Sequence, residues 1–186
     1  RGYVRRHFHS LRVSREGLGF LRAEAPLVVY SNHGSWWDPL ICLVLQQELL
    51  PGRTAFAPID AAMLQRYRLF RRLGFFGVER NSRRGARVFL EQSEAILRAR
   101  DSVLAITPQN GFEDVRARPI RFAPGLGHLA ARGVQARFVP VAFEYVFWEE
   151  RLPEVLVRFG ESVEVEAEGA ERLEAAEWTR RFALEL

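Results

Sequence analysis

Two kinds of hydrophobic periodicity alternate along this chain. Short apolar runs rich in β-branched residues, as in buried strands, are separated by segments whose apolar residues recur at helical spacing. We therefore expect strands at 11–13, 27–30, 54–57, 74–80, 103–106, 138–148, 155–159 and 161–166. We expect helices at 38–45, 60–72, 83–100, 124–132 and 171–186. This alternation predicts an α/β fold in which helices flank a mixed, largely parallel β-sheet.

Two of these segments carry more detailed expectations. Pro140 interrupts the strongest strand signal, 138–148, and indicates an edge strand or a break, because proline cannot donate to a ladder. Ser82 is expected to cap the helix 83–100. The spacing predicts that this helix turns six residues inward, namely Ala86, Phe89, Leu90, Ser93, Ile96 and Leu97.

The length of the chain predicts one domain. The 186 residues are 48% apolar and suffice for one full core, so we expect a single domain over residues 1–186. The chain begins with Arg1 and not with Met, so we expect a fragment or a processed chain. Residues 1–10 mix arginines with aromatic residues and resemble the end of an interfacial amphipathic helix. No apolar run approaches the roughly 18 residues that a membrane-spanning helix needs.

Charge is distributed unevenly. All basic residues are arginines, and residues 1–100 contain 17 of them against 8 acidic residues, within a net charge of +4. This surplus suits an anionic substrate or an anionic membrane surface, and an ordinary solvated surface explains it equally well. The predicted helix 60–72, which interleaves arginines with aromatic residues, fits either a membrane-bound helix or a helix with its apolar face on the core. The single cysteine, Cys42, allows no disulfide within the chain and no cysteine metal cluster.

The candidate chemistry lies between residues 27 and 45. An apolar strand delivers His33, a polar turn follows, and Asp38-Pro39 is expected to cap and begin the next helix. A tight strand-to-helix turn brings an imidazole and a carboxylate five residues apart within reach. His33 would then be a general base, with Asp38 orienting it. Two simpler interpretations stay open, namely Asp38 as a helix cap alone and His33 as a hydrogen-bonded turn residue.

Two further polar residues are expected near His33. Arg80 and Gln109 also follow predicted strands. Polar residues at the carboxyl ends of neighbouring parallel strands converge on one rim of a sheet, where sites gather in α/β proteins. If these strands are parallel neighbours, the three side chains meet there.

Three segments of the chain resemble motifs of the glycerolipid acyltransferases, a family that includes the glycerol-3-phosphate and lysophosphatidic acid acyltransferases. Asn32-His33-Gly34-Ser35-Trp36-Trp37-Asp38 is similar to their first motif. Gly74 through Arg80, an apolar strand ending in arginine, is similar to the second, and Val139-Pro140-Val141 is similar to the fourth. The order and spacing agree from about Arg12 to Phe147.

The third motif departs from the family pattern. The family usually has Pro-Glu-Gly-Thr-Arg after a strand, whereas this chain has Pro108 followed by Gln109-Asn110-Gly111-Phe112-Glu113. The usual arginine is missing, and Arg116 or Arg118 would have to replace it from farther along. In the family this motif helps to bind the phosphate of the acceptor. An amide in place of the carboxylate therefore suits a neutral, hydroxyl-rich acceptor such as a glycosylated lipid, and the asparagine-glycine pair also reads as a simple turn.

The resemblance implies an O-acyltransferase of lipid metabolism. The donor would be an acyl thioester, either acyl-CoA or acyl-acyl-carrier protein, and the acceptor a lysophospholipid or related lipid. His33 and Asp38 would be catalytic. The resemblance and the rim place the substrate-binding residues at Asn32, Arg80, Gln109, Gly111, Arg116 and Arg118. This chemistry needs no metal and no cofactor, and we expect none.

Two other functions remain open from the sequence. A thioesterase or lipid hydrolase would use the same pair of residues to activate water. A non-catalytic module would bind anionic membranes through its arginines, while nucleic acid is not an expected partner because no reading motif is present. We expect peripheral attachment to the cytoplasmic face of a membrane. The sequence does not fix the acceptor, the acyl-chain length, the choice of thioester or the oligomeric state.

Overall fold

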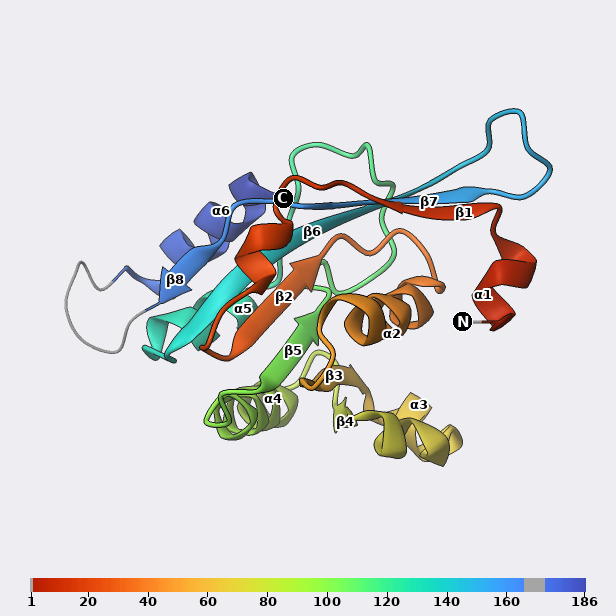
Figure 1. Cartoon of the computed structure of the whole chain (residues 1–186). Coiled ribbons are helices and arrows are strands. Elements are labelled where there is room, and N and C mark those ends of the chain that lie inside the picture. Colours follow the sequence, from red (N-terminus) through yellow and green to blue (C-terminus); the bar gives the residue numbers. More distant parts are fainter. Residues whose placement is uncertain (1, 166–172) are drawn as a thin grey trace.

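A mixed eight-stranded sheet forms the centre of the protein, whose computed structural model describes residues 2–165 and 173–186 (Figure 1). The strand order is β1-β7-β6-β2-β5-β3-β4, and β8 pairs with β6. The strands are β1 (Ser10–Val13), β2 (Leu27–Ser31), β3 (Thr54–Asp60), β4 (Phe75–Val78), β5 (Ser102–Ile106), β6 (Ala136–Val146), β7 (Glu154–Phe159) and β8 (Val163–Val165). The helices are α1 (Gly2–His7), α2 (Asp38–Leu49), α3 (Ala61–Arg66), α4 (Arg83–Ile96), α5 (Gly125–Ala131) and α6 (Ala175–Glu185), with 3₁₀ helices η1 (Leu18–Leu21) and η2 (Arg68–Leu73).

The predicted α/β class is confirmed, and the sheet is mostly parallel. Strand β2 lies between β5 and β6 and is parallel to both, and β3 joins β5 to β4 with parallel pairing. Only the pairs that β6 makes with β7 and β8 are antiparallel among the described strands. Because of this direction, the carboxyl ends of β2, β3, β4, β5 and β6 share one edge of the sheet, which we call the carboxyl edge.

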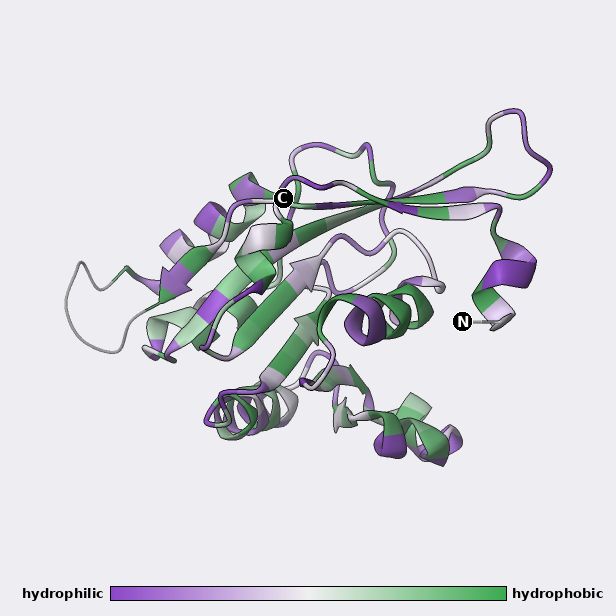
Figure 2. Ribbon diagram, in the orientation of Figure 1, coloured by the Kyte–Doolittle hydropathy of each residue, from purple (hydrophilic) through white to green (hydrophobic). Residues whose placement is uncertain are grey.

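Helices cover both faces of the sheet because the central strands are apolar on both sides (Figure 2). Alternate residues of β2 enter different cores, with Leu27 in one and Val28 in the other. The core that contains Val28 includes residues of α5 and α6, while the core that contains Leu27 includes residues of α1 and α2. The result is a three-layer α/β/α domain with α2 in front of the sheet in Figure 1.

Pro140 lies inside β6, so the alternative of an edge strand is wrong, whereas the alternative of a break applies to the pairing on one side of β6. Strand β6 continues through Pro140, which pairs with Tyr30 of β2 on one side. On the other side the neighbour changes from β7 to β8, between the pairs Val141–Phe159 and Phe138–Val163. Proline has no N–H to donate, and Pro140 lies at the gap between the pairing with β7 and the pairing with β8. The Pro140 carbonyl still accepts a hydrogen bond from the amide of Gly160 at 3.0 Å.

The segment predicted as one helix, 60–72, is broken at Tyr67. Asp60 caps α3 as expected, by accepting a hydrogen bond from the amide of Ala62 at 2.8 Å. Tyr67 then leaves the helical conformation, with φ −118° and ψ 73°, and η2 follows. The alternative of an ordinary core-facing helix is also wrong, because Leu64 is the only buried residue of α3 and η2.

The other helices and strands agree with the sequence within a few residues. Ser82 caps α4 as predicted, but Ala86 points to solvent, and the neighbouring Gly85 faces inward with Ser93 instead. The predicted segments 161–166 and 171–186 reach into 166–172, which lies outside the described residues. No helix in the described part of the chain is both long enough and apolar enough to cross a bilayer.

The packing of α6 on the sheet gives a test of this fold. Phe182 is fully buried and stacks on Phe138 of β6 and on Trp178. Phe182→Ala should lower the free energy of unfolding by about 3–5 kcal/mol, because it removes a large buried ring and leaves a cavity. Leu184→Ala on the same helix is the control, since Leu184 is 86% exposed and its loss should cost less than about 0.5 kcal/mol. Equal losses in urea unfolding would contradict the placement of α6.

Candidate active site

His33 and Asp38 meet at the carboxyl edge, as the sequence predicts. His33 follows β2 directly, and Asp38 is the first residue of α2. The Nδ1 atom of His33 lies 2.8 Å from Oδ2 of Asp38. The Asp38 side chain is 1% exposed and that of His33 20%, so a buried carboxylate supports a ring that still reaches the surface of the site. This contact fixes Nδ1 of the imidazole and leaves Nε2 for a substrate.

Asp38 is not a helix cap, and that simpler interpretation is wrong. The cap position belongs to Trp37, which makes no side-chain capping bond. Instead, the Asp38 carboxylate accepts three hydrogen bonds from outside its own helix: at Oδ2 from His33 and from the Ser35 amide at 3.2 Å, and at Oδ1 from the Tyr145 hydroxyl at 2.5 Å. Its position in the first turn of α2 also favours negative charge. The carboxylate is therefore built into the site.

Tyr145 belongs to the site, although it was not among the predicted site residues. It lies near the end of β6 and comes from more than a hundred residues away in the chain. Burial, and secondly the hydrogen bond to Asp38, raise the pKa of the Tyr145 hydroxyl far above its usual range. The hydroxyl therefore stays protonated and acts as a donor to Asp38. The only signal in the sequence was a tyrosine on a strand that ends at the expected rim.

The loop after β5 holds the backbone of His33. The Gln109 side chain accepts a hydrogen bond from the His33 amide at 2.7 Å, and the Glu113 amide donates to the His33 carbonyl at 2.9 Å. Gln109 also donates through Nε2 to the Glu113 carboxylate at 2.8 Å. The ring of Phe112 packs on the imidazole with 4.4 Å between centroids. We call these contacts the loop clamp. Glu113 and Phe112 were not among the predicted site residues.

Asn32, predicted to bind substrate, has both polar atoms engaged within the protein. Its amide nitrogen donates to the carbonyl of Phe143, and its oxygen accepts from the amide of the same residue, both at 2.8 Å. Asn32 is 8% exposed. The side chain thus extends the pairing of β2 with β6 by one step and fixes the start of the turn that carries His33.

The three predicted arginines lie less close together than His33 and Asp38 do. Arg80 donates to the carbonyl of Asn110, which ties the end of the β4 segment to the loop after β5. Arg118 folds back on its own loop and donates to the carbonyls of Val115 and Ala117, at 3.0 and 2.8 Å. Arg116 is exposed. Among the predicted residues the structure thus joins Arg80 to the site loop and leaves Arg116 and Arg118 on its outer part.

The Asn110-Gly111 turn is present as the sequence suggested. Asn110 adopts a positive φ of 64°. Gly111 has open space where a Cβ would stand, so the structure does not require a glycine there for reasons of packing. The turn places Asn110 against Arg80 and leads the chain directly to Phe112.

An apolar cavity of about 200 Å³ reaches the His33–Asp38 pair. It lies between α2 and the strands β2, β3 and β5, and both catalytic candidates line it. Its other walls are mainly aliphatic and aromatic, including Leu45, Leu49, Ala57, Ala105 and Phe75. Cys42 also lines the cavity, and burial together with the nearby Asp38 raises the pKa of its thiol to about 12. At neutral pH this thiol is protonated and is a poor nucleophile.

The arrangement offers a base and an apolar chamber. In the described part of the chain, no group of three or more His, Cys, Asp or Glu residues is placed to hold a metal ion. The groups at the site are therefore an imidazole oriented by a buried carboxylate and an opening lined by hydrocarbon side chains. Such a site can remove a proton from a hydroxyl or a water next to a bound apolar chain.

Comparisons with known proteins agree with this geometry. The chain has the fold of the 1-acyl-sn-glycerophosphate (LPA) acyltransferase PlsC from Thermotoga maritima, whose crystal structure it matches with a TM-score of 0.57 and 19% identity, over 95% of this chain and 71% of that one. A search of curated proteins finds no significant match. The profile of the family named Acyltransferase matches residues 12–144, well over half of the chain. The site at His33 and Asp38 lies within this range, and the chain belongs to the Acyltransferase family.

Proposed function

We propose that this protein is an O-acyltransferase that moves a fatty acyl group from an acyl thioester to a hydroxyl of a lysophospholipid or a related lipid. The donor is acyl-CoA or acyl-acyl-carrier protein. The observation that carries the proposal is the apolar cavity that both His33 and Asp38 line. Membership in the Acyltransferase family supports the reaction class.

In this mechanism His33 is the general base. Its Nε2 takes the proton of the acceptor hydroxyl while that oxygen attacks the thioester carbonyl carbon. A new C–O bond forms and the C–S bond breaks. The proton then passes from His33 to the departing thiolate. Asp38 holds the ring through Nδ1 and stabilises the imidazolium that exists between the two proton transfers.

The acyl chain occupies the cavity between α2 and the sheet. Its walls have the hydrocarbon surface that a fatty chain requires, and a chain bound there has its thioester carbonyl beside His33, which also lines the cavity. Burial of the chain removes apolar surface from water, at about 0.8 kcal/mol for each CH₂ group. The length of the cavity therefore influences which thioesters are used.

The acceptor reaches His33 from the side of the loop clamp. Arg80, with Arg116 or Arg118, supplies a guanidinium for a phosphate of the acceptor or the donor. Gln109 contributes through the loop clamp, since its oxygen accepts from His33 and its nitrogen donates to Glu113. The amide at position 109 is thus explained by these hydrogen bonds within the protein, and it does not distinguish between acceptors. Both a phosphate-bearing and a hydroxyl-rich acceptor remain open.

The proton transfer predicts the effect of changes at the His33–Asp38 pair. His33→Ala should abolish acyl transfer from a labelled thioester, and Asp38→Asn should lower kcat roughly 10²- to 10⁴-fold, because an amide cannot accept all the hydrogen bonds of the carboxylate. The assay follows label into lipid acceptors, with thermal unfolding as a control for folding. Wild-type turnover by His33→Ala would remove the mechanism. Release of free fatty acid with no acylated lipid, across a panel of lysophospholipids and glycolipids, would favour a thioesterase or lipid hydrolase instead.

The cavity predicts a dependence on chain length. Ala57→Leu adds volume to the wall and should shift the preference of the enzyme toward shorter acyl thioesters, with little change for the shortest ones. Ala86→Leu is the matched control, because Ala86 is exposed on α4, away from the cavity lining. Rates measured over a series of chain lengths test the assignment, and an unchanged profile in Ala57→Leu would place the acyl chain elsewhere.

The loop clamp predicts a reciprocal pair of variants. Gln109→Glu places a second carboxylate next to that of Glu113, where the two repel each other. The variant should lose about 1–3 kcal/mol of stability and have a lower kcat, because the loop that holds His33 loosens. The double variant Gln109→Glu/Glu113→Gln restores one donor facing one carboxylate and should recover most of both losses. Urea unfolding and acyl-transfer rates measure the coupling. Additive losses in the double variant would show that the two side chains do not act together.

A further inference from the structure

Most of the large exposed apolar side chains lie on connections that begin or end at the carboxyl edge. Ten such side chains stand out among the described residues, and nine lie on segments that begin or end at this edge: Tyr3, Trp36, Met63, Tyr67, Leu69, Leu73, Phe112, Phe147 and Trp148. Tyr3 belongs to α1, which meets this edge because β1 runs antiparallel to β2. The tenth, Leu184, lies on α6. Such a one-sided distribution marks an interaction surface.

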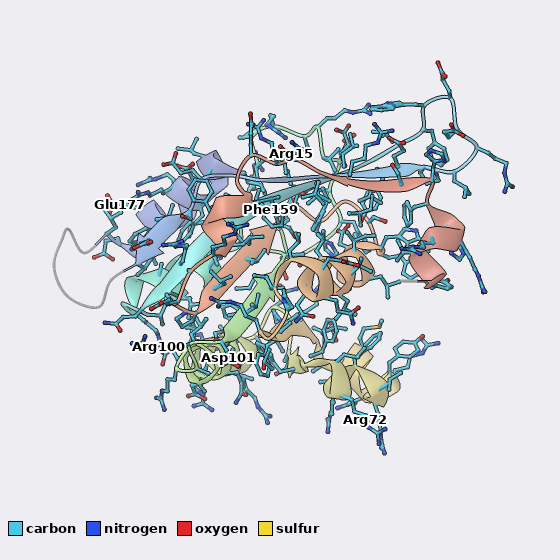
Figure 3. The ribbon with its side chains drawn as sticks, viewed as in Figure 1. Arg15, Arg72, Arg100, Asp101, Phe159 and Glu177 are labelled. Atoms are coloured by element: carbon cyan, nitrogen blue, oxygen red, sulfur yellow. The ribbon has the colours of Figure 1, made fainter. Side chains whose placement is uncertain are left out.

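The segment of α3 and η2, residues 61–73, combines these side chains with positive charge. It contains four arginines (Arg66, Arg68, Arg71 and Arg72) and no acidic residue. Leu69 is 64% exposed and Tyr67 43%, although both are apolar enough to favour burial. Figure 3 shows Arg72 extending outward from this segment, away from the sheet. We call residues 61–73 the basic segment.

The basic segment adjoins the proposed acyl cavity. It leaves β3 at the carboxyl edge and returns to the amino end of β4, because these two strands are parallel, and β3 lies two strands away from β2, which leads to His33. Leu73, its last residue, and Phe75 just beyond it line the cavity. A partner bound to the basic segment therefore lies beside a wall of this cavity.

We propose that the basic segment docks on an anionic lipid bilayer, with Tyr67 and Leu69 inserted among the headgroups and its arginines bound to lipid phosphates. Arginines near an anionic surface attract it electrostatically, and interleaved aromatic and aliphatic side chains bury apolar area in the interface. A second copy of the chain does not fit, because two such segments would repel each other. Access of lipid substrates to the cavity rests on the proposed function, whereas docking itself does not.

Sedimentation with phospholipid vesicles tests the docking. The 186-residue chain should bind vesicles that contain phosphatidylglycerol more tightly than vesicles of phosphatidylcholine alone, and the difference should shrink at high salt. Arg71→Gln/Arg72→Gln should weaken binding to the anionic vesicles roughly 25-fold at low salt. Leu69→Ser should weaken binding to the same vesicles roughly tenfold.

Matched variants on other parts of the surface separate docking from general charge and hydrophobicity. Arg98→Gln/Arg100→Gln removes the same charge from exposed residues at the amino end of β5, where Figure 3 labels Arg100, and should bind as the wild type does. Leu184→Ser, the counterpart of Leu69→Ser, should likewise be unaffected. Equal weakening by test and control variants would overturn the proposal, as would undiminished vesicle binding by Arg71→Gln/Arg72→Gln and Leu69→Ser.

A second readout keeps this proposal distinct from the proposed function. Acyl transfer to an acceptor dispersed in detergent should be retained in Arg71→Gln/Arg72→Gln, while transfer to the same acceptor in anionic vesicles should fall. Normal vesicle binding combined with a loss of activity that is specific to acyl-acyl-carrier protein would show that the basic segment serves an acidic protein, and would overturn docking on lipid. No activity in any variant or the wild type, with vesicle binding as predicted, would count against the acyltransferase and leave docking intact.

Discussion

The hydrogen bonds that hold His33 determine what the rest of the site can do. Its backbone amide and carbonyl are both bound by the loop after β5, and its ring nitrogen Nδ1 is bound by Asp38 at the start of α2. These partners come from two different connections of the sheet. Because the backbone and one ring nitrogen are fixed from both sides, the direction of Nε2 is set before any substrate binds, which is the preorganisation that general-base catalysis requires.

Parallel strand order makes this convergence possible. Strands β5 and β6 flank β2 with the same direction, so the loop with Gln109 and the end of β6 with Tyr145 both reach the residues that follow β2. Asn32 strengthens the junction by pairing its amide with the backbone of Phe143. Most of the exposed apolar side chains lie on connections that begin or end at the same edge.

Local patterns in the sequence predicted the α/β class, most elements and the meeting of His33 with Asp38, because a strand, a short turn and a helix fix that distance over five residues. The sequence did not reveal the roles of Tyr145 or Glu113, since a contact made across a hundred residues or within an irregular loop leaves no periodic signal. Asp38-Pro39 was misread for a related reason: aspartate before proline suits a helix cap. The groups that donate hydrogen bonds to the Asp38 carboxylate come instead from the turn before the helix and from a distant strand. Residues 61–73 differ again: their helical spacing fitted a core-facing helix as well as a membrane-bound one, and in α3 and η2 only Leu64 is buried.

The site also reconciles two opposed requirements. A fatty chain needs an apolar chamber, yet an uncompensated carboxylate beside such a chamber would cost several kcal/mol in lost hydration. Asp38 is almost fully buried at the wall of the cavity, where three donors and the first turn of α2 take the place of the water that its carboxylate has lost. Two of those donors are the Ser35 amide, which binds Oδ2, and the Tyr145 hydroxyl, which binds Oδ1. The polar network around one aspartate thus lets an imidazole and an apolar cavity share a wall, as the proposed acyl transfer requires.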